Sequence, residues 1–151
     1  MSNGLTLSIC LRCRDGRETQ ASDLAQRGGR RLATAVVDMF AASDAERSGI
    51  ELRGVHCMSQ CKRPCTIALS GYGRFTCLFG DLDPTRHAAD VLSVAAAYAS
   101  SANGALPRAS RPQVLQAGIL GRIPPIGFAD TPVEPLSVSH DHKNQQDRKQ
   151  T

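Results

Sequence analysis

The chain has 151 residues, a modest formal net charge of +4, no tryptophan and an aromatic content of only 4%. This length suffices for one domain whose core must be built mainly from aliphatic side chains. No apolar run approaches the roughly 20 residues that a transmembrane helix needs, and the first residues lack the pattern of a signal peptide. We therefore expect a cytoplasmic protein that contacts neither a membrane nor nucleic acid.

The first half of the chain predicts two strands that each lead to a cysteine. Residues 5–9 alternate apolar and polar side chains, the period of a half-buried strand, and run directly into Cys10. Apolar residues at helical spacing predict a helix over 29–42. Residues 50–55 predict a second strand, which delivers the chain to Cys57.

A hairpin and a helix are predicted next. Residues 66–70 and 74–79 flank a glycine-rich turn and predict a β-hairpin. Asp83 and Pro84 are typical of an N-cap and a first helical turn, and the apolar spacing that follows predicts a helix ending near residue 103. The order β-α-β-β-β-α indicates an α/β fold with helices packed on a sheet.

The chain is expected to divide into one domain, an extension and a tail. Residues 1–105 form the predicted domain. Residues 106–128 contain four prolines around a short apolar piece and predict an irregular extension that wraps the domain, with one helical turn. Residues 129–151, which include His140 and His142, are polar and predict a disordered tail.

Cysteines are the strongest functional signal in the sequence. Cys57, Cys61 and Cys65 follow one another at four-residue intervals, and Cys10 and Cys13 supply two more thiols from a distant stretch. Structural disulfides are rare in a reducing cytosol, whereas thiolates select zinc, copper(I) or iron-sulfur clusters. A [2Fe-2S] cluster takes four such ligands, two for each iron. These five thiols are one more than the cluster needs, and their spacing leaves open which four bind.

Two other nearby side chains are not expected to ligate a metal. Cys77 shares a strand face with Phe75 and Phe79, which predicts ordinary core packing. His56 precedes Cys57, and adjacent residues of a strand point to opposite faces.

The central segment resembles the second half of thioredoxin-like [2Fe-2S] ferredoxins. The run from Val55 to Cys61 and the glycine hairpin at 71–76 carry this resemblance, which extends to the related small subunit of respiratory NADH dehydrogenase and of bacterial hydrogenases. It implies a thioredoxin-like fold and a [2Fe-2S] cluster with Cys57 and Cys61 as ligands. In those families the other ligand pair follows the first strand, where Cys10 and Cys13 stand here with a shorter separation. The implied metal ligands are therefore Cys10, Cys13, Cys57 and Cys61, with Cys65 as a further candidate to bind the cofactor.

Residues 5–127 are more closely similar to an uncharacterised bacterial family of predicted metal-binding proteins, the domain of unknown function 1636. The segments at 61–69, 80–84 and 121–125 carry this likeness. Together these resemblances predict a ferredoxin-like one-electron carrier rather than an enzyme.

Two alternatives stay open at the level of sequence. Four thiolates in a tetrahedral array would suit zinc, so the chain could be a zinc or other metal-binding module. The Cys10-x-x-Cys13 motif after a strand is also where a thioredoxin-like thiol-disulfide oxidoreductase carries its reactive pair.

Basic residues flank the predicted ligands at Arg12, Arg14, Lys62 and Arg63. Their positive charge would stabilise the reduced, more negative form of a cluster, and it would attract a redox partner protein with an acidic surface. The sequence names neither the electron donor nor the acceptor, and it leaves open whether the chain forms a homodimer.

Overall fold

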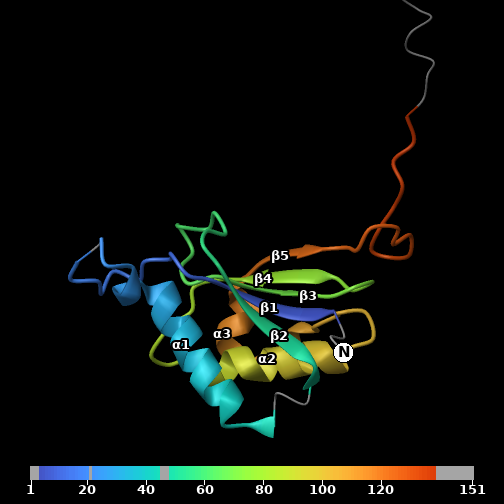
Figure 1. The fold of residues 1–151 in the computed structure, drawn as a ribbon. Helices are drawn as coiled ribbons and strands as arrows, with labels where there is room; N and C mark the ends of the chain where they lie inside the picture. Colours follow the sequence, from blue (N-terminus) through green and yellow to red (C-terminus); the bar gives the residue numbers. More distant parts are fainter. Residues whose placement is uncertain (1–3, 21, 45–47, 139–151) are drawn as a thin grey trace, which may run out of the picture.

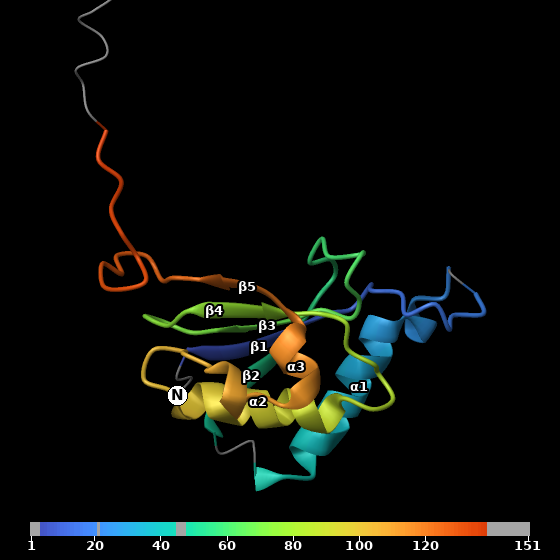
Figure 2. The same ribbon diagram turned by 180° about the vertical axis from the view of Figure 1, so that it is seen from behind.

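The computed structural model describes residues 4–20, 22–44 and 48–138 (Figure 1). The strands are β1 (Leu5–Cys10), β2 (Ile50–Val55), β3 (Ile67–Ser70), β4 (Thr76–Phe79) and β5 (Ile119–Ile123), and the helices are α1 (Gly28–Ala41), α2 (Ala88–Ser100) and α3 (Gln113–Ala117), with single 3-10 turns η1 (Leu24–Gln26) and η3 (Arg108–Ser110). All three α-helices lie on one face of the sheet, and no described helix covers the other (Figures 1 and 2).

The strand order is β2-β1-β3-β4-β5, so β1 lies between β2 and β3. β1 pairs in parallel with β2, from Leu5 opposite Ile50 to Cys10 opposite Val55. The N–H of Cys10 donates to the carbonyl of Thr66, where the chain enters β3. Because parallel strands end at the same edge of a sheet, the loops that follow β1 and β2 leave the sheet together.

The core lies between the sheet and the helices. Alternate residues of β1 point toward the helices, as the sequence pattern predicts, and meet the fully buried faces of α1 and α2; the core includes Leu5, Leu7, Ile9, Leu32, Val36, Val91, Val94 and Tyr98. The Tyr98 hydroxyl donates to the carbonyl of Phe75 at 2.6 Å, which satisfies its polar end inside the core. Cys77 is fully buried in the same core, which confirms the prediction that it packs structurally.

The predicted start of the second long helix is wrong, whereas α1 lies within one residue of its predicted bounds. Asp83 and Pro84 belong to a turn, and α2 begins at Ala88. The carboxylate of Asp83 accepts hydrogen bonds from Thr85 and Arg17, and its carbonyl accepts from the N–H of His87. Asp83 therefore closes a turn and binds a distant loop, and it does not cap the helix.

The extension at 106–128 is more regular than its prolines predict. It contains η3, α3 and the strand β5, which pairs antiparallel with β4 through a bulge at Leu78 and Phe79. The prolines lie outside these paired residues, so they do not interrupt the ladder. Beyond β5, Phe128 packs edge-on against Phe75 with ring centroids 5.0 Å apart.

The predicted disordered tail lies partly outside the described residues. Residues 129–138 contain neither a helix nor a strand, and the remainder, with His140 and His142, lies beyond the described range. Among the described residues, no helix has the length and apolar character to cross a membrane.

Candidate metal centre

Three of the five predicted thiols lie together in a buried group at the end of β1. Cys10 and Cys13 are each 3% exposed, and Cys65 is fully buried. The side chains of Cys10 and Cys13 are hydrogen-bonded to each other, and Cys65 is close enough for the charge of Cys13 to act on its thiol. We call Cys10, Cys13 and Cys65 the inner thiols.

Backbone N–H groups from both loops surround the inner thiols. The N–H groups of Arg12, Cys13 and Met58 donate to the sulfur of Cys10. Met58 belongs to the loop after β2 and directly follows Cys57, so the two cysteine-bearing stretches are in direct contact. Such donors stabilise sulfur that carries negative charge, whether as a free thiolate or bound to a metal.

The electrostatics of the inner thiols are unequal. Burial raises the pKa of Cys10, but the hydrogen bonds from Cys13 and from the backbone outweigh it and hold this pKa below its ordinary value. Burial and the hydrogen bond to Cys10 raise the pKa of Cys13 to about 11. Burial and the charge of Cys13 raise the pKa of Cys65 to about 12. Cys10 is therefore the inner thiol that ionises most readily.

Cys57 and Cys61 form a separate, exposed pair, which we call the outer thiols. They line a hollow of about 440 Å³ together with Ser59, Gln60 and Lys62. Ser59 adopts a positive φ of 58°, and its N–H donates to the Cys57 sulfur at 3.4 Å, which fixes a tight turn between the outer thiols.

The thiols are thus arranged in two groups that meet at Met58. Within the described ranges, no three Cys, His, Asp or Glu side chains converge as ligands of a single metal ion do. His56, which was not expected to ligate, is exposed at the end of β2. Soft sulfur donors in two groups suit a centre with two metals, each held by two thiolates.

The start of α1 packs tightly against the inner thiols. The N–H of Gly29 donates to the carbonyl of Cys13 at 3.0 Å. A Cβ on Gly29 would lie 1.9 Å from the carbonyl oxygen of Cys10, a distance that no side chain tolerates. Glycine at this position therefore lets the positive end of the helix dipole approach Cys10 and Cys13.

The loop that carries Cys13 is held in place by carboxylates. Glu18 accepts hydrogen bonds from the N–H groups of Asp15, Gly16 and Gly28 at 3.0 Å each. Arg17 makes a bidentate pair with Asp83, with N–O distances of 2.9 and 3.1 Å. The loop after β1 is thereby joined both to the start of α1 and to the turn before α2.

The loop that carries the outer thiols is attached to the same turn. The N–H of Cys65 donates to the carbonyl of Leu82 at 3.3 Å, and the Arg63 guanidinium pairs with Asp81. No local sequence pattern indicated a role for Asp81, whose partner Arg63 lies 18 residues away, or for the bond that joins Glu18 to the start of α1 at Gly28.

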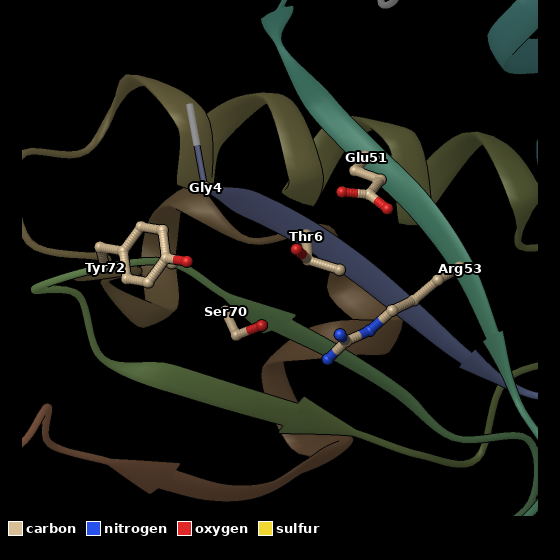
Figure 3. Close-up of a pocket in the computed structure, with 7 residues that line it drawn as sticks. Gly4, Thr6, Glu51, Arg53, Ser70 and Tyr72 are labelled. Carbon is tan, nitrogen blue, oxygen red and sulfur yellow. The ribbon is translucent and has the colours of Figure 1, made fainter. Parts of the chain in front are cut away.

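A second hollow, of about 490 Å³, lies on the uncovered face of the sheet (Figure 3). Its lining is polar and contains no thiol; the residues are Gly4, Thr6, Glu51, Arg53, Ser70, Gly71 and Tyr72. The Arg53 side chain crosses β1 and donates to the Ser8 hydroxyl at 2.8 Å. Because Gly4 and Tyr72 lie at the start of β1 and the end of β3, this hollow extends toward the opposite end of the sheet from Cys10.

Comparisons with known proteins give a family and a fold. A family model described as "Protein of unknown function (DUF1636)" matches residues 7–125. No sequence among the curated proteins matches the chain.

The structure of a thioredoxin-like [2Fe-2S] ferredoxin from Aquifex aeolicus is similar, with a TM-score of 0.50 and 17% identity over 83% of this chain and 97% of that chain. A structure of the wild-type thioredoxin-like [2Fe-2S] ferredoxin from the same organism matches with a TM-score of 0.48 and 16% identity, over 78% and 96%. The first of these similarities shows that the fold is thioredoxin-like, as the sequence resemblance implied.

Replacing Gly29 with alanine should disturb the inner thiols, because the new Cβ would overlap the carbonyl of Cys10. We expect Gly29→Ala to lower the free energy of unfolding by about 1–3 kcal/mol in urea titrations followed by circular dichroism. Gly121→Ala is the matched control, since nothing lies within 4 Å of its added Cβ. Equal stability of the two variants would contradict the close packing of α1 on Cys10.

Glu18 should stabilise the protein in a pH-dependent way. Burial raises its pKa, but the hydrogen bonds from the backbone outweigh it and lower the pKa to about 2, from an ordinary value of 4.5. A depressed carboxyl pKa stabilises the fold fully above the ordinary value, and this contribution is lost as the pH falls from about 4.5 toward 2.

Glu18→Gln should therefore cost about 1 kcal/mol of unfolding free energy at pH 7, and the difference from the wild type should shrink through that acid window. Urea unfolding of the thiol-reduced, metal-free protein at pH 7, 4.5 and 3 measures this difference. A gap between the two proteins that stays constant across these pH values would contradict the role of Glu18.

Proposed function

This chain belongs to the DUF1636 family, and we propose that it is a cysteine-ligated metal protein that holds a [2Fe-2S] cluster and serves as a cytoplasmic one-electron carrier, not an enzyme. The observation that carries this proposal is the contact at Met58. Its N–H donates to the sulfur of Cys10, so the loop that carries the outer thiols lies directly against one of the inner thiols. The similar structure from Aquifex aeolicus is that of a thioredoxin-like [2Fe-2S] ferredoxin, which supports the choice of cofactor.

We assign Cys10 and Cys13 to one side of the centre and Cys57 and Cys61 to the other. The side chains of Cys10 and Cys13 are hydrogen-bonded to each other, and Cys57 and Cys61 line one hollow. Cys65 is the spare thiol in this assignment, because it is fully buried and its backbone is attached to Leu82. A bound cluster would supply a couple that accepts and releases one electron.

The residues around the thiols would adjust that couple. The N–H groups of Arg12, Cys13 and Met58 would offset added negative charge on the sulfurs, and the exposed side chain of Lys62 lies beside the outer thiols. Both effects favour the reduced form and raise the reduction potential. The carboxylates Asp15 and Asp83 are paired with Arg31 and Arg17, so their charge opposes this effect only weakly.

A thiol-disulfide oxidoreductase is the second candidate function, and one observation favours it. Cys10 and Cys13 are hydrogen-bonded, and their pKa values are displaced in opposite directions. This asymmetry suits a pair in which Cys10 attacks and Cys13 resolves. It leaves Cys57 and Cys61 without a purpose, which is why we prefer the cluster.

Cys57→Ser and Cys61→Ser should each abolish or strongly shift the visible absorption of anaerobically purified protein, because each removes a thiolate from the centre. Iron, zinc and acid-labile sulfide counts accompany the spectra. Cys65→Ala and Cys77→Ala are the matched controls, and both should keep the wild-type spectrum.

Other outcomes identify the alternatives. Unchanged iron and sulfide in both serine variants would refute their assignment as ligands. A colourless protein with stoichiometric zinc and no sulfide would make the chain a zinc module. Disulfide reductase activity of the metal-free protein that disappears in Cys10→Ser would favour the second candidate.

A further inference from the structure

We propose that the surface around the outer thiols is a docking site for an acidic redox protein, recognised by Arg12, Arg14 and Lys62. We call these three residues the basic rim. The proposal rests on the proposed function in one respect, since it takes Cys57 and Cys61 to be the exposed ligands of the redox centre.

The basic rim lies at the cysteine end of the sheet. Lys62 lines the hollow that contains both outer thiols. The N–H of Arg12 donates to the Cys10 sulfur, and Arg14 directly follows Cys13. The loops that carry these residues lie at the same end of the sheet in both ribbon views (Figures 1 and 2). All three rim side chains are exposed.

The rim cations are not neutralised within the described part of the chain. The nearby carboxylates are engaged by other groups: Asp15 pairs with Arg31, Asp83 with Arg17 and Asp81 with Arg63, and Glu18 accepts three backbone N–H groups. No described acidic residue forms an ion pair with Arg12, Arg14 or Lys62. Their charge therefore faces solvent.

Positive charge is concentrated at this end of the molecule. Residues 11–31 and 56–65 together carry eight Arg and Lys against three Asp and Glu, a local net charge of +5, whereas the whole chain carries +4. The rest of the sequence is thus slightly negative in sum. A field of one sign around an exposed redox centre steers a partner of the opposite sign into a productive orientation.

The few unpaired cations of the basic rim fit a transient partner. Electron-transfer complexes bury less area than stable ones, so a few unpaired cations around a small hollow suffice to orient the encounter. The partner that matches this surface carries a cluster of Asp and Glu beside its own one-electron centre.

The test compares two double variants that remove the same charge. Arg12→Gln/Lys62→Gln removes rim cations, and Arg108→Gln/Arg122→Gln removes two exposed cations from η3 and β5. The probe is a flavodoxin, an acidic protein whose oxidised flavin takes one electron, with a proton from water, to become the neutral semiquinone. The donor is the dithionite-reduced holoprotein, which loses that one electron with no bond made or broken.

Stopped-flow measurement should show that the second-order rate constant falls about tenfold between 0.01 and 0.15 M ionic strength, where the Debye length shortens from about 30 to about 8 Å. The rim variant should lose most of this salt dependence, and the control variant should keep it. Equal salt dependence in the two double variants, or a wild-type rate that does not fall with salt, would overturn the proposal.

A binding arm separates this proposal from the proposed function. Biolayer interferometry of the purified chain on immobilised flavodoxin, cytochrome c and duplex DNA needs no cluster. Tighter binding to flavodoxin than to basic cytochrome c, weakened about tenfold or more in the rim variant only, supports the docking site even if sulfide analysis shows that no cluster is present. Stronger binding to DNA than to flavodoxin at the same ionic strength would instead make the rim a nucleic-acid surface.

Discussion

The in-register parallel pairing of β1 with β2 is the constraint on which the site depends. It places Cys10 opposite Val55, so the chain leaves both strands at the same level of the sheet. From there only His56 separates Val55 from Cys57, and the N–H of the next residue, Met58, donates to the Cys10 sulfur. A shift of β2 by one residue would move the loop along the sheet and turn its side chains to the other face. The meeting of the two cysteine stretches is therefore a property of the sheet register.

The fold was predictable where local pattern and burial agree. β1 alternates in sequence because its odd residues enter the core, and α1 shows helical spacing because Leu32 and Val36 face the sheet. The thioredoxin-like class followed from resemblance and is confirmed by the similar structure. Two predictions are wrong where tertiary contacts decide the structure. Asp83 was predicted to cap a helix, but its carboxylate binds Arg17. The extension was predicted to be irregular because of its prolines, but it contains β5, which pairs with β4.

The sequence indicated which residues make up the candidate site but not their environment. Spacing selected the five thiols, whereas the division into buried Cys10, Cys13 and Cys65 and exposed Cys57 and Cys61 depends on how two loops pack. Gly29 is a poor helix former by propensity. Only the structure shows why glycine stands there, because the carbonyl of Cys10 occupies the space that a Cβ would need. The nearby carboxylates are engaged by groups other than the basic rim, so the rim cations are not neutralised. Composition alone could not show this.

The direction of β5 determines where further chain can be attached. β5 begins opposite Phe79, near the cysteine end, and ends opposite Thr76, so the segment that follows leaves from the far end of the sheet (Figures 1 and 2). An affinity tag or a surface linker placed after residue 138 would hold the molecule by that end and present the thiols outward. Immobilisation on an electrode through this segment would thus leave the cysteine loops facing the solution. Direct contact between these loops and the electrode surface would require an attachment at another part of the chain.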